Sequence, residues 1–277
     1  MTQSSLTVPT IVSIQSDMRI NSVKQALKQG KTQLGCSFSQ LRSPEVPRIL
    51  AAAGLDWTYL DSEHGGFDLE TLQDLCRSAV LAGLCPVVRV ADLQYPLIAR
   101  ALDCGAQGVL FPRVESPELL AKAISWTRFP PEGVRGYGLT APHLEYENIG
   151  MPEVIAHLNQ NTLVVFQIET KTALERIDDL LSVPNIDAVM IGPADLSISL
   201  GVPGQFDHPK LVEAIELIRD ACNRHGIAPG LHMRSLPLVK KWRERGMRFL
   251  SCNSEVGFLL EKATETVAEL RGKSAGA

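Results

Sequence analysis

Short apolar runs alternate with longer amphipathic stretches along this chain. The runs are rich in β-branched residues, which is typical of strands buried on both faces of a parallel sheet. The amphipathic stretches have the length and period of surface helices. The predicted strands are 33–37, 57–60, 86–90, 108–111, 163–168, 188–191, 228–231 and 248–251. The clearest predicted helices are 69–82, 93–103, 117–127, 210–225 and 236–245.

Glycines and short polar residues mark the ends of these helices. A glycine that follows a helix and precedes a strand is typical of the C′ position; the examples are Gly54, Gly83, Gly105, Gly226 and Gly246. Asp68, Ser116 and Asp207 are candidate N-caps. Strands and helices that alternate in this way over about 250 residues predict an α/β protein, a closed (β/α)8 TIM barrel.

We expect one barrel domain over residues 23–277, preceded by an N-terminal arm over residues 1–22. One connection is unusually long, because no strand of ordinary length is predicted between residues 128 and 161. Its segment 129–138 is rich in glycine and proline. Loops of this length usually serve function, and the alternative is a surface excursion.

Composition narrows the class of protein. The chain has 277 residues, a net charge of −4 and no basic cluster, so we expect no nucleic-acid partner. The six cysteines have no metal-binding spacing, which indicates free thiols in a reducing compartment. No run is apolar enough to cross a membrane, and the first 20 residues do not resemble a signal peptide. We therefore expect a cytoplasmic protein without a membrane partner.

Acidic residues stand directly after two of the predicted strands. Glu169 follows the run that ends at Ile168, and Asp195 follows shortly after Ile191. Residues just past the strand ends of a barrel face its active-site end. Two carboxylates there would form a hard oxygen site for a divalent cation and leave positions open for a 2-oxo acid. The alternative is that each acid merely caps the following turn.

Other strand ends carry further candidate groups. Asp61, Glu63 and His64 follow the second strand, and His64 could transfer protons while Asp61 orients its ring. Arg89 ends the third strand and could bind an oxyanion, although an inter-strand salt bridge is the alternative. A structural role for His64 and a supporting role for His232 also stay open.

Backbone N–H groups add a further candidate anion site. Pro193 opens a helical turn, and the N–H groups of Ala194 and Asp195 are free to bind a carboxylate there. Other chemistries lack their residues. No lysine stands at a strand end to form a Schiff base, and no dinucleotide, P-loop, serine-hydrolase or zinc-protease motif is present.

Five motifs together resemble the HpcH/HpaI aldolase/citrate lyase family, in order and in spacing. They begin at Asp61, Pro86, Arg128, Gln167 and Gly192, and read DSEH, PVVR, RFPPEGVRG, QIET and GPADLS. The similarity runs from about residue 24 to about residue 270. It is strongest to the metal-dependent pyruvate aldolases, such as 4-hydroxy-2-oxoheptanedioate aldolase and 2-dehydro-3-deoxyglucarate aldolase.

This resemblance implies a barrel of the phosphoenolpyruvate/pyruvate-binding type. It implies a divalent ion (Mg²⁺, Mn²⁺ or Co²⁺) bound by Glu169 and Asp195, and His64 as acid and base paired with Asp61. It further implies that Asp103 reaches this pair from a neighbouring subunit of a hexamer, a trimer of dimers with exchanged C-terminal helices. The residues expected to bind pyruvate are Arg89, Gln167, Gly192, Pro193, Ala194, Asp195 and Leu231.

The implied activity is reversible cleavage of 4-hydroxy-2-oxo acids to pyruvate and an aldehyde, through a metal-stabilised pyruvate enolate. Oxaloacetate decarboxylation would be a side activity. The alternatives are a CoA-ester lyase of the citrate lyase β or malyl-CoA type, an enzyme that traps the enolate as macrophomate synthase does, and a non-catalytic 2-oxo-acid-binding barrel. The chain departs from the family at Ser62, at residues 137–145 and at His232 to Arg234. These departures leave the aldehyde unidentified.

Overall fold

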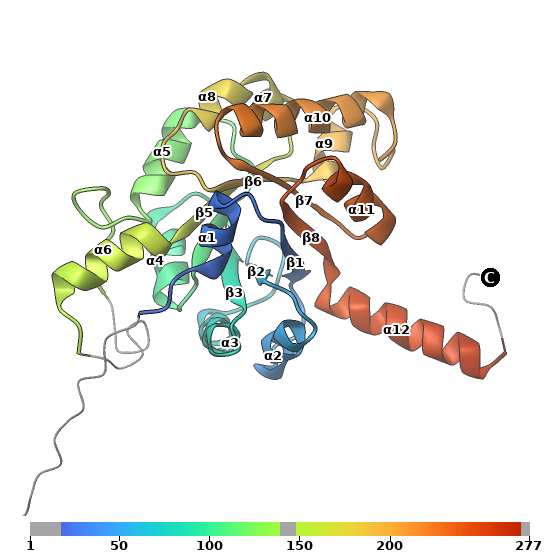
Figure 1. The fold of residues 1–277 in the computed structure, drawn as a ribbon, viewed down its shortest axis with the longest axis horizontal. Helices are drawn as coiled ribbons and strands as arrows, with labels where there is room; N and C mark the ends of the chain where they lie inside the picture. Colours follow the sequence, from blue (N-terminus) through green and yellow to red (C-terminus); the bar gives the residue numbers. More distant parts are fainter. Residues whose placement is uncertain (1–17, 139–147, 273–277) are drawn as a thin grey trace, which may run out of the picture.

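Eight parallel strands close into a barrel in the order β1 to β8 (Figure 1). The computed structural model describes residues 18–138 and 148–272. The strands are β1 Gln33–Phe38, β2 Trp57–Asp61, β3 Cys85–Arg89, β4 Gly108–Phe111, β5 Leu163–Ile168, β6 Ala188–Ile191, β7 Ala228–Met233 and β8 Phe249–Ser254. The (β/α)8 prediction is confirmed, and the strand boundaries shift by three residues at most.

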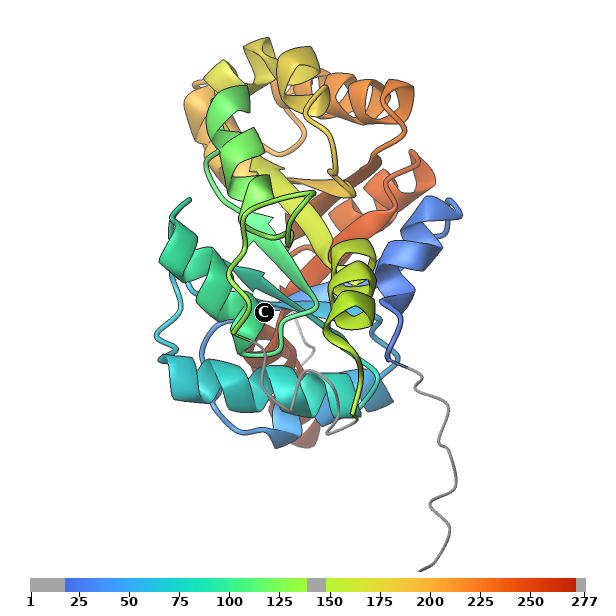
Figure 2. The ribbon, with the colours of Figure 1, turned by 90° about the vertical axis from the view of Figure 1, so that its left-hand side faces the viewer.

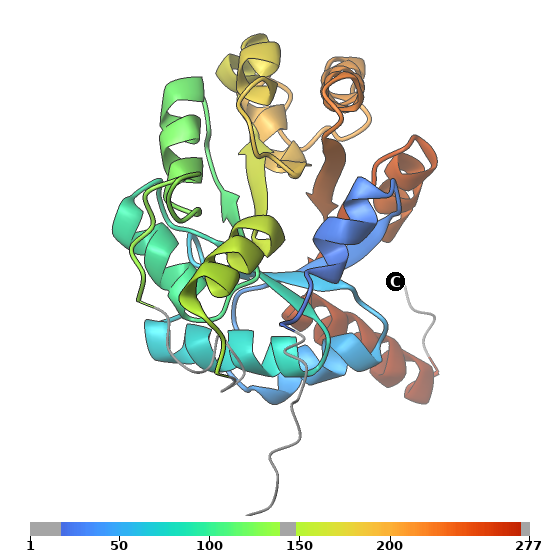
Figure 3. The same cartoon turned by 60° about the vertical axis from the view of Figure 1, so that its left-hand side comes forward.

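Helices surround the barrel on its outside (Figures 2 and 3). They are α1 Ser22–Lys28, α2 Glu45–Ala52, α3 Leu69–Leu81, α4 Tyr95–Asp103, α5 Pro117–Ser125, α6 Met151–Asn161, α7 Lys171–Glu175, α8 Ile177–Leu181, α9 Pro193–Ser199, α10 Pro209–Arg224, α11 Leu236–Glu244 and α12 Glu255–Leu270. Within residues 18–138 and 148–272, no helix has the length and apolar character of a membrane span.

Most of the predicted helix ends are confirmed. Asp68 and Ser116 accept backbone hydrogen bonds as the N-caps of α3 and α5. The predicted cap Asp207 is wrong, because the neighbouring His208 is the N-cap of α10 and its ring accepts from the Lys210 N–H. The C′ glycines Gly54, Gly83, Gly105, Gly226 and Gly246 all have positive φ.

The long connection between β4 and β5 contains a helix that the sequence analysis did not predict. This helix, α6, buries only Val154 and Asn159, so its apolar pattern is weak. Residues 139–147, which include most of the departure from the family noted above, lie outside the described residues, as does most of the N-terminal arm.

Side chains alternate between two cores along each strand. One core fills the barrel interior and includes Trp57, Val87, Leu163 and Phe249. The other lies between the barrel and its helices. The amino-terminal end of the barrel, here called the floor, is closed by α1, whose Val23 and Leu27 belong to the interior core.

The inward-facing residues become polar toward the carboxyl ends of the strands, here called the mouth. Tyr59 and Val87 belong to the apolar interior core, and the next inward positions on the same strands are Asp61 and Arg89. Asp61 and Arg89 are register partners in neighbouring strands. Alternation and register therefore bring candidate residues from distant parts of the sequence to one end of the barrel.

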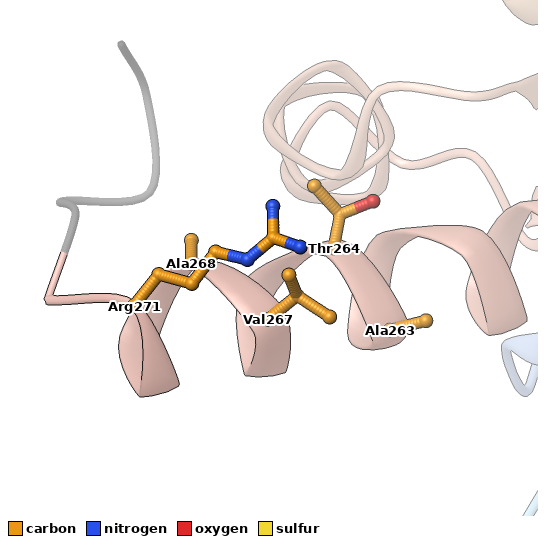
Figure 4. A pocket seen from close by; sticks show the side chains of 5 residues that line it. All are labelled: Ala263, Thr264, Val267, Ala268 and Arg271. Atoms are coloured by element: carbon orange, nitrogen blue, oxygen red, sulfur yellow. The ribbon is translucent and has the colours of Figure 1, made fainter.

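The last helix, α12, extends away from the barrel (Figures 1 and 3). Its first residue, Glu255, is buried, whereas Leu259, Leu260 and Leu270 are more than half exposed. A shallow groove of about 360 Å³ lies on this helix (Figure 4). It is lined by Ala263, Thr264, Val267, Ala268 and Arg271.

Candidate active site at the mouth of the barrel

Arg89 lies at the centre of a buried polar network at the mouth. Its guanidinium donates to both carboxylate oxygens of Asp61, at 2.9 and 2.6 Å. It also lies 3.1 Å from the Glu63 carboxylate and donates to Gln167 Oε1 at 3.3 Å. The inter-strand salt bridge considered for Arg89 is therefore present. It fixes the guanidinium in place with only 11% of the side chain exposed.

Asp61 also holds the loop that follows β2. Its Oδ1 accepts from the backbone N–H groups of Glu63 and His64, at 3.0 and 3.2 Å. Burial would raise the pKa of Asp61, but the hydrogen bonds and charge of Arg89 outweigh burial and hold this pKa below its ordinary value. A Cβ on Gly65 would lie 2.1 Å from the Asp61 carbonyl oxygen, so the tight turn requires glycine there.

The predicted contact between Asp61 and the His64 ring is not formed among the described residues. Both carboxylate oxygens of Asp61 accept from Arg89, and Oδ1 also accepts from the His64 backbone N–H. The His64 side chain is 68% exposed at the mouth, and its Nε2 lies 3.8 Å from Glu63. Glu63 is thus the carboxylate next to the His64 ring, whereas Asp61 contacts only the backbone of His64.

Glu169 is a buried carboxylate with mixed neighbours. It accepts from the Arg113 N–H at 2.8 Å and from Gln167 Nε2 at 3.0 Å. Arg113 has a φ of 54°, a strained value for a non-glycine residue, which aims its N–H at Glu169. Burial raises the pKa of Glu169, the Arg113 hydrogen bond opposes this, and the charges of Glu63 and Asp195 add to it.

Neither carboxylate is merely a helix cap. The side chain of Thr170, not Glu169, caps α7, and Gly192 is the N-cap of α9 without a side-chain hydrogen bond. Asp195 lies in the first turn of α9, near enough for its charge to affect Glu169. The capping alternative is therefore wrong for both residues.

Gly192 leaves the space that this part of the site needs. A Cβ there would lie 2.8 Å from Glu169 Oε2 and 3.3 Å from Gln167 Nε2. Pro193 is buried, whereas Ala194 and Asp195 are exposed at the start of α9. The first-turn N–H groups have no intrahelical partner, so those of Ala194 and Asp195 face water or a ligand.

The Leu231 side chain does not face the mouth, and the predicted substrate contact of this residue stays a prediction. Leu231 is fully buried in the core between barrel and helices, because its position on β7 points outward. The inward position is His232, whose Nδ1 lies 2.8 Å from Ser251 Oγ. The His232 ring packs edge-on against Tyr59 at 5.5 Å between centroids.

Asp103 does not lie at the mouth of its own barrel. It is the last residue of α4, which leads into the amino-terminal end of β4, so it belongs to the floor end. There Asp103 forms a 2.7 Å ion pair with the buried Arg135 of the long connection. An Asp103 contact with the mouth would therefore require a second subunit.

Some residues at the mouth were not singled out as candidates by the sequence analysis. Arg113 contributes a backbone N–H, which no side-chain motif signals. Ser251 on β8 contacts the inward-facing His232 ring, and Ser37 Oγ donates to the Asn253 carbonyl oxygen at 3.2 Å. Counting alternate positions from Phe249 along β8 would have placed Ser251 on the inward face near the mouth.

The model of the HpcH/HpaI aldolase/citrate lyase family matches residues 34–261. The chain belongs to this family. A 5-keto-4-deoxy-D-glucarate aldolase of Salmonella paratyphi C is 32% identical over 237 residues, which cover 86% of this chain and 91% of the relative.

Solved structures of similar proteins agree with this membership. An HpcH/HpaI aldolase from Desulfitobacterium hafniense is 30% identical with a TM-score of 0.87, covering 94% of this chain and 100% of that one. Macrophomate synthase is 26% identical with a TM-score of 0.79, covering 93% and 94%. The family and these relatives confirm the aldolase class predicted from the sequence.

Proposed function

We propose that the protein is a divalent-metal-dependent aldolase that reversibly cleaves 4-hydroxy-2-oxo acids to pyruvate and an aldehyde. The observation that carries this proposal is the arrangement at the mouth, where an immobilised Arg89 and the amide of Gln167 lie beside the buried Glu169. A cation-binding carboxylate next to a fixed guanidinium suits a substrate with adjacent carbonyl and carboxylate oxygens.

The residues present fit a divalent ion. Glu169 and Asp195 supply hard oxygen donors. Burial, together with the charges of Glu63 and Asp195, raises the pKa of Glu169, and a bound cation would relieve this cost of ionisation. No cluster of three or more ligand side chains occurs in the described residues. Two protein carboxylates would leave positions for water and substrate, which suits Mg²⁺, Mn²⁺ or Co²⁺.

Each residue around the ion has a task in pyruvate binding. Arg89 would donate to the 2-oxo oxygen, where negative charge develops as the substrate is cleaved. Gln167 would orient the same end of the substrate. The N–H groups of Ala194 and Asp195 would bind the carboxylate at the start of α9. The bound ion supplies a Lewis acid that favours the enolate form of pyruvate.

His64 would accept the proton from the 4-hydroxyl group as the carbon–carbon bond breaks. Its ring is exposed at the mouth, and its Nε2 lies 3.8 Å from the Glu63 carboxylate, so it can reach a substrate while it stands next to an acidic group. Asp61 would act one step away, because it fixes both Arg89 and the backbone of the His64 loop.

The site would be completed by a second subunit. Asp103 lies at the floor end of its own barrel, so its predicted role requires a neighbour. The exposed leucines and the groove on α12 support an exchanged C-terminal helix and a hexamer of three dimers (Figure 4). The six cysteines are free thiols, which supports a cytoplasmic location.

The decisive experiment supplies pyruvate, Mn²⁺ and deuterated water, and follows exchange at the pyruvate methyl group by NMR. The same protein is then given a panel of aldehydes, and adducts are identified by mass spectrometry. We expect exchange and adducts, both abolished by EDTA and restored by added metal. Arg89→Lys should slow exchange by about 10²–10³-fold, because the planar fork is lost.

Two outcomes would overturn the proposal. Full activity in excess EDTA would exclude the metal-dependent route. Binding of pyruvate without exchange or adducts would favour the non-catalytic barrel. Oxaloacetate decarboxylation, a further proposed activity, is measured in the same preparations by the release of CO₂.

A further inference from the structure

The Arg89 guanidinium lies on an aromatic ring that has no role in the proposed pyruvate chemistry. Its Cζ lies over the Tyr59 ring, 5.5 Å from the ring centroid. A guanidinium within about 6 Å of an aromatic centroid is attracted by the negative face of the ring, and more strongly where water is excluded. Tyr59 is 4% exposed, so this contact is formed away from water.

The polar contacts of Arg89 act mainly within the plane of its guanidinium. Nε and Nη2 donate to Asp61, and Nη1 faces Glu63 and Gln167. Contacts at the edges of a planar group leave it free to tilt about the line that joins its partners. The Tyr59 ring beneath Cζ limits this tilt.

Strand β2 supplies both kinds of contact to Arg89. Tyr59 belongs to the interior core and lies one inward position below Asp61 on this strand. Tyr59 is the register partner of Val87 on β3, and Asp61 is the register partner of Arg89. A change at Tyr59 therefore alters the support of the guanidinium and leaves its carboxylate partner in place.

The Tyr59 ring is itself held in position. The His232 ring packs edge-on against it, at 5.5 Å between centroids and 89° between planes, and His232 Nδ1 lies 2.8 Å from Ser251 Oγ. Burial, helped by the charges of Arg89 and Arg234, lowers the pKa of His232 to about 4. Burial also raises the pKa of Tyr59. Both rings are therefore uncharged near pH 7, and the guanidinium lies above neutral groups.

We propose that Tyr59 is a positioning residue for the aldolase reaction, whose ring sets the tilt of the Arg89 guanidinium toward the 2-oxo oxygen of pyruvate. This inference rests on the proposed function. Negative charge develops on that oxygen as the enolate forms, and a donor that is fixed in advance stabilises it most. Without the ring, Arg89 would keep its charge and its ion pairs but lose its orientation. The reaction should then slow more than pyruvate binding weakens.

The test follows pyruvate methyl exchange in deuterated water at saturating Mn²⁺. Tyr59→Leu and Tyr59→Met remove the ring and fill different parts of its volume, whereas Tyr59→Phe retains it. The matched control is Phe249→Leu. Phe249 belongs to the same interior core and stacks on Trp57, with 3.8 Å between ring centroids. Circular dichroism and urea unfolding verify that each protein is folded.

The two variants without a ring should lower kcat for exchange by about 10- to 100-fold, because a misplaced donor stabilises the enolate poorly. Their KM for pyruvate should stay within about 3-fold of the wild-type value, as expected when a contact of the transition state is lost. Tyr59→Phe should retain most of the wild-type rate. Phe249→Leu should do so as well, although it removes a ring of similar size from the same core.

A double-mutant cycle tests whether Tyr59 acts through Arg89. Arg89→Lys removes the planar group that lies over the ring, so adding Tyr59→Leu to it should slow exchange by only about 2-fold or less. An undiminished loss in the Arg89→Lys background would overturn the inference, because Tyr59 would then act independently of the guanidinium.

Two further results would overturn the inference. Equal losses of kcat in Tyr59→Leu and Phe249→Leu would show that the ring only fills the core. A rise in the KM for pyruvate without a fall in kcat would assign the ring to substrate binding. Failure of the proposed function is distinguishable from both, because it would appear as a wild type without exchange.

Discussion

The surroundings of Glu169 show how single residues prepare the site. The carboxylate is buried, accepts two hydrogen bonds and lies near other acids, so its ionised form is costly without a cation. Gly192 is part of the same arrangement, because any larger residue would meet Glu169 and Gln167. The Glu169 carboxylate is therefore positioned by Arg113, Gln167 and Gly192 as well as by its place at the end of β5.

Gly192→Ala should weaken metal binding. The added Cβ would lie 2.8 Å from Glu169 Oε2 and would displace that carboxylate. We expect Mn²⁺ affinity, measured by isothermal titration calorimetry, to fall about 10-fold or more, as for other disturbed ligand environments. Gly150→Ala is the control, because its Cβ would meet nothing closer than 3.9 Å. Equal affinities in both variants would contradict this account.

As the pH is lowered, the affinity for the metal ion should begin to fall at a higher pH than it would with a glutamate of ordinary pKa. Only the ionised carboxylate binds the ion, and the folded protein raises the pKa of Glu169 above 4.5. Protons therefore compete with the ion before an unperturbed glutamate begins to titrate. Mn²⁺ titrations between about pH 7 and pH 5 should show a progressive loss of affinity. Constant affinity across this range would show that the carboxylate is not destabilised.

At the scale of elements, Glu255 joins the start of α12 to the loop after β1. Its Oε1 accepts from the backbone N–H groups of Ser39, Gln40 and Leu41, at 3.1, 2.7 and 3.1 Å. Arg42 of the same loop donates to the Gly66 carbonyl oxygen at 2.9 Å. The position of α12 is thus connected, through the loop after β1, to the loop that carries His64.

Glu255→Ala should destabilise the protein by about 1–3 kcal/mol. The buried Glu255 carboxylate accepts from three backbone N–H groups, and the substitution leaves these donors without their acceptor. Urea unfolding followed by circular dichroism, at one fixed protein concentration, measures this loss. Glu261→Ala is the matched control on the exposed part of α12 and should stay within about 0.5 kcal/mol of the wild type. Equal midpoints for the two variants would show that the loop does not depend on Glu255.

Predictability from the sequence also differed between elements. The strands were predictable because both of their faces are buried, which gives continuous apolar runs such as 163–168. α6 was missed because it buries few apolar side chains. Candidates at strand ends were found from sequence, but the partners of Asp61 and the outward direction of Leu231 depend on register and alternation between strands.

At the scale of the whole molecule, one chain does not contain every group expected to act. Asp103 and its partner Arg135 lie at the floor end, while the candidate site lies at the mouth. The apolar residues Leu259, Leu260 and Leu270 of α12 are exposed, because this long helix extends away from the barrel (Figure 1). Both features are consistent with an assembly that brings the mouth of one barrel to the floor end of another.

Mixing two inactive variants should therefore restore activity. Asp103→Ala removes the group expected from the neighbour, and Glu169→Ala removes a metal ligand of the same composite site. Subunit exchange would create some sites that carry neither change, so aldol activity should rise toward about a quarter of the wild-type rate, in line with random pairing in symmetric assemblies. No recovery, with exchange verified by native mass spectrometry, would place Asp103 outside the site.

The closed floor also sets the order in which ligands travel. Val23 and Leu27 of α1 plug the barrel, and Lys24 forms a 2.9 Å ion pair with Asp187 at that end, so ligands pass through the mouth. The Arg89 side chain lies deeper in the mouth than the exposed His64 side chain, so pyruvate would enter first and depart last. In the cleavage direction pyruvate should then inhibit competitively against the hydroxy-oxo acid, and the aldehyde noncompetitively. Competitive inhibition by both products would show that pyruvate and the aldehyde leave in either order. The ordered pattern would mean that, at a high pyruvate concentration, the enzyme stays in its pyruvate-bound form, to which an aldehyde can add.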